Sequence, residues 1–134
     1  MALTGMVHDE DPREKLLNEV GTWIDDIDIF HNQILLAIYD RSKHALKTKS
    51  GIYISQRTAG EDEHQGKVGL VIKKGPLAFV DDDTVKFHGQ NVEIGDWIGL
   101  RPSDGWPLKI NDTICRMVRD VDVRARARTP DCIY

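Results

Sequence analysis

Apolar residues first recur at a helical spacing near the start of the chain. Asp11 is a suitable N-cap, Pro12 suits the first helical position, and Glu14 follows three residues after the cap. Gly21 weakens the pattern, which predicts an amphipathic helix that ends near Asp26. The helix docks either on its own domain or on a neighbouring subunit or partner, and the sequence leaves both alternatives open. Its apolar face comprises Leu16, Leu17, Val20, Trp23, Ile24 and Ile27.

The pattern changes to short β-strands from Phe30 onward. Residues 34–39 are apolar without interruption, which predicts a strand that is buried on both faces or covered by another subunit. Residues 80–89 predict a polar hairpin or loop, and residues 101–107 predict a tight turn. Because many short strands alternate with Gly and Pro turns, we expect a mainly β fold in the form of a small β-barrel. Further strands are expected within residues 67–74, 92–100, 113–118 and 120–128.

Charge is distributed unevenly along the 134 residues. Residues 1–100 hold 11 Lys and Arg against 17 Asp and Glu, whereas residues 101–134 hold 7 against 5. The formal net charge of −4 argues against a general nucleic-acid binder. We expect no secretory signal, and no apolar run approaches the roughly 20 residues of a membrane span.

No group of side chains has the spacing of a catalytic or metal site. The five histidines form no HxH or HxxxH pair, the serines lie in no GxSxG context, and the glycines form no phosphate-binding loop. Cys115 lies in an apolar stretch and is expected to be buried, while Cys132 is expected to be exposed. We therefore expect a reduced, cytoplasmic protein with no enzyme activity, no metal and no other cofactor.

Two local patterns each allow a functional and a structural interpretation. Arg124, Arg126 and Arg128 alternate, so a strand would place them on one side as a phosphate-binding stripe or as a solvated, salt-bridged face. The acidic net charge favours the second interpretation. Trp97 and Trp106 flank the predicted turn, either as a ligand platform or, as we favour, with one in the core and one against the turn.

The order of these segments resembles a GroES-type co-chaperonin. Residues 34–39 are similar to the apolar strand that opens the family's domain. Residues 47–54 are similar to its mobile loop, which carries a hydrophobic tripeptide after a glycine, and residues 66–72 to the strand that follows that loop. Residues 92–98 are similar to the family's Val-x-x-Gly-Asp-x-Val turn into a strand. In detail the chain looks like GroES-like proteins encoded by tailed bacteriophages.

The resemblance implies a fold and a function. Residues 1–29 would be an N-terminal extension with the amphipathic helix, residues 30–128 a GroES-like, partly open β-barrel, and residues 129–134 a C-terminal tail. The protein would form a homo-oligomeric ring of seven subunits that binds a host or phage chaperonin and assists the folding of capsid proteins. It would act in the cytoplasm of the infected bacterium, and the hairpin around residues 81–83 would form a roof.

The resemblance also implies two binding surfaces. The loop would bind the chaperonin through Gly51, Ile52, Tyr53 and Ile54. The subunit interface would include Ile34, Leu36, Ile38, Val121, Val123, Arg124 and Arg126. A packed strand is the plainer alternative for residues 52–54.

A virion structural protein built on the same barrel is the competing hypothesis. As a capsid decoration, cement or head–tail component, it would use the N-terminal helix and residues 130–134 to dock on the major capsid protein. Its location would then be the virion. Neither hypothesis involves nucleic acid or a membrane.

Overall fold

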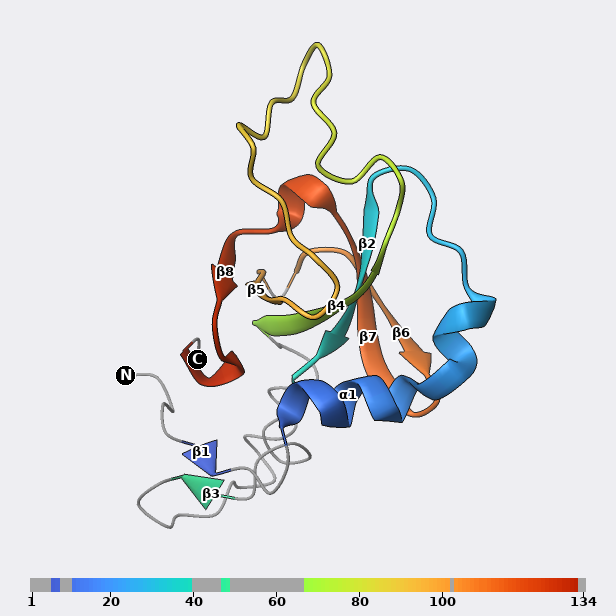
Figure 1. Cartoon of the computed structure of the whole chain (residues 1–134), viewed down its shortest axis with the longest axis vertical. Helices are drawn as coiled ribbons and strands as arrows, with labels where there is room; N and C mark the ends of the chain where they lie inside the picture. Colours follow the sequence, from blue (N-terminus) through green and yellow to red (C-terminus); the bar gives the residue numbers. More distant parts are fainter. Residues whose placement is uncertain (1–5, 8–10, 40–46, 49–66, 102, 133–134) are drawn as a thin grey trace.

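The main element of the fold is a six-stranded antiparallel sheet in the order β6-β7-β2-β4-β5-β8 (Figure 1). The structure is a computed structural model that describes residues 6–7, 11–39, 47–48, 67–101 and 103–132. Within these residues β6 and β8, the two outermost strands, do not pair with each other, so the sheet is not closed. The strands are β2 (Gln33–Ile38), β4 (Val68–Lys74), β5 (Trp97–Gly99), β6 (Trp106–Ile110), β7 (Thr113–Arg119) and β8 (Ala125–Ala127).

Shorter elements complete the described part of the chain. β1 (Met6–Val7) pairs with β3 (Lys47–Thr48) in a separate two-stranded sheet. The helices are α1 (Pro12–Val20) and the 3-10 segments η1 (Gly21–Asp26), η2 (Asp120–Asp122) and η3 (Pro130–Cys132). The prediction of a mainly β fold preceded by a helix is confirmed at this level.

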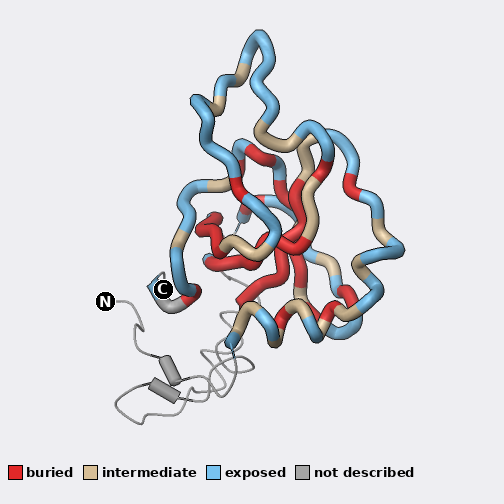
Figure 2. Tube along the Cα trace, viewed as in Figure 1, coloured by how far each residue is buried: buried red, intermediate tan, exposed pale blue. Residues whose placement is uncertain are grey.

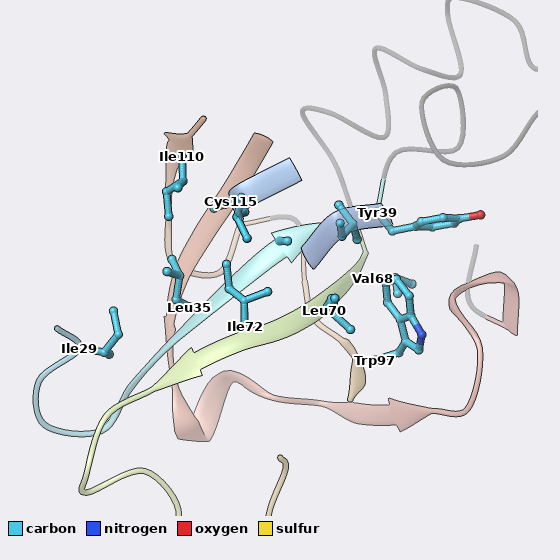
Figure 3. Close-up of a cluster of buried hydrophobic side chains, with 12 residues drawn as sticks. Ile29, Leu35, Tyr39, Val68, Leu70, Ile72, Trp97, Ile110 and Cys115 are labelled. Atoms are coloured by element: carbon cyan, nitrogen blue, oxygen red, sulfur yellow. The ribbon is translucent and has the colours of Figure 1, made fainter. Parts of the chain in front are cut away.

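β2 lies between β7 and β4 near the middle of the sheet, and its two faces are both buried within this chain. Leu35 and Ala37 belong to one hydrophobic cluster, part of which is drawn in Figure 3. Ile34 and Leu36 point to the opposite face and join a second cluster. The uninterrupted apolar run therefore needs no second subunit to cover it.

The helical segment closes one face of the sheet. Asp11 caps α1 by accepting a hydrogen bond from the backbone N–H of Arg13, as predicted. Leu16 and Val20 are buried in the cluster of Figure 3, so the helix docks on its own domain. The same cluster includes residues from before and after residue 29, and the core does not divide there.

The helical segment ends at Asp26, as predicted, but α1 itself ends at Val20. Gly21 has φ +57°, a left-handed conformation that ends the α-helix, and the chain continues as the 3-10 segment η1. The change of helix type rotates the apolar pattern. Trp23 is consequently 58% exposed, whereas Ile24 packs against the cluster.

A β-bulge in β4 connects the helical segment to the sheet. Leu35 pairs with Lys73 and Leu36 pairs with Val71, so Ile72 is the extra residue. Ile72 joins the cluster beneath the helix, and the Lys73 ammonium donates hydrogen bonds to the carbonyls of Ile24, at 2.9 Å, and Ile27. The lysine thus stabilises the end of η1, where carbonyl groups lack helical partners.

Two strand predictions need correction. β6 begins at Trp106, inside the region predicted to be a tight turn, because Trp106 to Ile110 pair with β7. At the end of the chain, the alternating run from Asp120 begins as η2, and only Ala125–Ala127 forms a strand. The expected strands around β2, β4, β5 and β7 are present.

The docking of α1 can be tested by truncating its buried face. Because Leu16 is fully buried, Leu16→Ala removes buried methyl groups and is expected to lower the free energy of unfolding by about 2–5 kcal/mol. Trp23→Ala is the control, with an expected change within about 0.5 kcal/mol because its side chain is largely exposed. Urea unfolding monitored by circular dichroism measures both. Equal, small losses would contradict the docking of α1 on its own sheet.

Candidate interaction surfaces

The antiparallel pairing sends two long connections to opposite ends of the sheet. At one end Ile38 pairs with Gly69, so residues 40–66 join β2 to β4 there. At the other end Ile34 pairs with Lys74, and residues 75–96 leave β4 from that end before returning to β5. The second connection forms the long loop at the top of Figure 1, and Figure 2 shows that most of it is exposed.

Close backbone packing anchors the start of this loop. A Cβ atom on Gly75 would lie 2.3 Å from the carbonyl oxygen of His31, so only glycine allows this approach. The backbone N–H of Leu77 then donates to the same oxygen at 3.0 Å. Phe79 and Phe87 pack edge to face with their ring centroids 5.4 Å apart, which holds the outgoing and returning segments of the loop together.

Aspartates order the tip of the loop. The Asp82 carboxylate accepts hydrogen bonds from the backbone N–H groups of Thr84 and Val85 at 2.8 and 2.7 Å. These bonds lower the pKa of Asp82, and the bond from Val85 has the largest effect. Asp81 accepts a bond from the backbone N–H of Phe87 at 2.7 Å. The acidic run is exposed, and two of its carboxylates fix the turn.

Asp120 joins the loop to the rest of the sheet, although it is buried and the sequence analysis did not single it out. One carboxylate oxygen accepts from the Phe79 backbone N–H at 3.1 Å. The other accepts from the Asn32 side chain at 3.1 Å and from the Val121 backbone N–H at 2.7 Å. The position of Asp120 directly after a strand and before a short helical turn is the local sequence signal for an aspartate that accepts hydrogen bonds from neighbouring backbone N–H groups.

Removing this carboxylate is expected to be costly. Asp120→Ala leaves the partly buried donors of Asn32 and Phe79 without their acceptor, at about 1 kcal/mol for each group, the low end of the cost for a buried unsatisfied donor. Asp120→Asn retains one acceptor oxygen and should lose less. Thermal and urea unfolding of the two variants measure the difference. An alanine variant as stable as the wild type would show that the carboxylate does not support the loop.

A groove of about 760 Å³ lies between this loop and the segment that leads into β8. Arg126 borders it, donates to the Asn91 carbonyl at 3.2 Å and lies 3.8 Å from the Asp96 carboxylate. Arg124 lies 3.8 Å from Asp104. These two members of the arginine series therefore have acidic partners in their own chain, as the favoured interpretation predicts. β8 pairs only with β5 among the described residues, which leaves it at the edge of the sheet.

The predicted interface residues do not form one accessible surface. Ile34, Leu36 and Ile38 are at most 2% exposed, and they fill the chain's own core. Val121 is 39% exposed, and Arg124 and Arg126 are also exposed. Val123 is half-buried against the second cluster.

The other predicted binding residues have separate locations. Gly51, Ile52, Tyr53 and Ile54 lie outside the described residues. On the helical segment, Leu16 and Val20 are unavailable to a partner because they are buried. Leu17, Ile24 and Ile27 are partly buried against the same cluster.

Asp104 and Trp97 have structural contacts, whereas Trp106 is exposed. Hydrogen bonds from the Arg101 side chain lower the pKa of Asp104, which is itself buried. Trp97 is in the core and packs edge to face on Tyr39, while Trp106 is 55% exposed. Across the described ranges, no cluster of three or more histidine, cysteine or carboxylate side chains has the arrangement of a metal site.

The two thiols differ as predicted, Cys115 being buried and Cys132 exposed. Burial raises the pKa of Cys115 to about 12, so its reactive thiolate is scarce at neutral pH. We expect iodoacetamide at pH 8 to alkylate Cys132 in the native protein and to reach Cys115 only after unfolding in urea. Peptide mass spectrometry identifies the modified thiol. Rapid native alkylation of Cys115 would contradict its burial.

None of the described helices is long and apolar enough to cross a bilayer. No protein-family model matches the chain, and no curated protein matches its sequence.

Proposed function

We propose that this chain is a co-chaperonin of the GroES type, a ring-forming lid without catalysis of its own. The observation that supports this most is that the connections before and after β4 start from opposite ends of that strand. A lid needs one end that contacts the chaperonin and another that closes the chamber. Residues 40–66 supply the contact end, and the loop of residues 75–96 supplies the roof.

The contact would depend on the apolar residues Ile52, Tyr53 and Ile54 between β2 and β4. Burial of such side chains contributes about 1.5–3 kcal/mol each. Ordering the surrounding backbone costs about 1–2 kcal/mol per residue, so one loop binds weakly. Identical loops on a ring bind together and reach a much higher avidity. The resemblance in residues 47–54 supports this assignment of the contact.

Assembly of the ring would use the closing segment and not the apolar strand β2. Val121, Arg124 and Arg126 are exposed beside the groove, and β8 has an unpaired edge among the described residues. Asp25, Asp26 and Asp28 are exposed on the segment after α1. An acidic segment on one subunit and a basic edge on the next are electrostatically complementary, which supports a head-to-tail ring.

The decisive test replaces the apolar contact residues. The double variant Ile52→Ser/Ile54→Ser should lose chaperonin-dependent refolding of a denatured test enzyme, because the loop no longer buries apolar surface on the chaperonin. Its oligomeric state in analytical ultracentrifugation should equal that of the wild type. Ile94→Ser, an exposed residue in the roof connection, is the matched control and should refold the enzyme normally.

The outcomes separate the competing functions. Unchanged refolding by the double variant would overturn the co-chaperonin proposal. Mass spectrometry of purified phage particles addresses the virion hypothesis, which requires the protein among the particle components. Its absence from particles, despite expression in infected cells, would exclude a capsid role.

A further inference from the structure

A second, smaller pocket of about 320 Å³ opens at the base of the roof connection. Three apolar side chains at its margin are unusually exposed: Leu77 at 53%, Val80 at 51% and Val121 at 39%. Val85 and Phe87 line it further in and are partly buried. A concave apolar surface of this kind is typical of a site that accepts an apolar side chain from a partner.

The pocket is held in shape before any partner arrives. Leu77 is tied to the turn at His31 by its backbone N–H, and Phe87 is held against Phe79. The Asp120 carboxylate, which also lines the pocket, links the loop to Val121. Binding would therefore require little ordering of the protein, which favours affinity from a small contact.

The margin of the pocket is acidic. Asp82 lines it, and its neighbours Asp81 and Asp83 are exposed on the same turn. Asp83 forms no hydrogen bond or ion pair with the described residues, so its charge is open to a partner. Lys86 lies near Asp82 on the same loop, but the three carboxylates outnumber it. The surface therefore favours a ligand that is apolar at one position and cationic beside it.

Area and charge both argue against a second copy of the chain as the occupant. A stable interface buries about 800 Å² on each partner, far more than three half-exposed aliphatic side chains provide. In a symmetric contact of this face with itself, the two runs of residues 81–83 would also face each other, and like charges in contact are repulsive.

We propose that this pocket binds an extended polypeptide segment in which an apolar residue is flanked by lysine or arginine. Leu77, Val80 and Val121 would contact the apolar residue, and the carboxylates of residues 81–83 would attract the flanking cations. Segments of this composition are exposed in incompletely folded proteins. The pocket is lined by residues from 31 to 32, 77 to 87 and 120 to 121, and its binding is tested on the isolated chain, so it does not depend on the co-chaperonin proposal.

Fluorescence anisotropy with a labelled peptide of alternating leucine and lysine tests the site on the full chain. We expect saturable binding, and no binding of the matched peptide in which glutamate replaces lysine. Leu77→Ser/Val80→Ser should weaken binding about tenfold or more, since it removes much of the apolar contact. Asp83→Asn should weaken it about two- to threefold at low salt and reduce its salt dependence.

Two controls make the result specific. Ile94→Ser removes an equally exposed apolar side chain outside the pocket and should bind the peptide as the wild type does. Circular dichroism confirms that each variant is folded. Absence of saturable binding, or equal weakening by Ile94→Ser, would overturn the proposal. It would also be overturned if Leu77→Ser/Val80→Ser changed only the sedimentation of the chain, because a second copy would then occupy the surface.

Discussion

The burial of β2 on both faces is the constraint on which the rest of the structure depends. Its odd-numbered side chains need a cover on one side and its even-numbered side chains need another. The helical segment provides the first cover through Leu16 and Val20. Residues that follow β4, together with Val92, Leu100 and Val123, provide the second. Because both covers come from the same chain, a six-stranded sheet without closure can still bury its centre.

This arrangement leaves the ends of the sheet free for interactions. The connections before and after β4 start from opposite ends of that strand. At the start of residues 75–96 the buried carboxylate of Asp120 adds to the packing of Ala78 and Phe79 against the second cluster. The loop can therefore present Leu77 and Val80 to solvent without losing its anchorage. Exposed apolar residues on a fixed support are a common feature of surfaces that bind other polypeptides.

Prediction from the sequence succeeded where one local signal dominates. The cap at Asp11, the strand at β2 and the burial of Cys115 each follow from a few adjacent residues. It failed at β6, where Pro107 and the exposed Trp106 indicate a turn, and only pairing with β7 makes the segment a strand. The end of the helical segment at Asp26 was predicted, but not the change at Gly21 from an α-helix to a 3-10 helix.

The sequence by itself determined which residues avoid water: the apolar face of α1, the run of β2 and the thiol of Cys115. It also determined that no spacing typical of a catalytic or metal site is present. Only the tertiary structure decided what covers those apolar residues, placing Ile34, Leu36 and Leu16 in the chain's own core. Periodicity defines an apolar face but not what covers it. The hydrophobic effect is non-directional, so a segment of the same chain or a second subunit would bury that face equally well. The pocket beside Val121 likewise exists only because distant segments meet there.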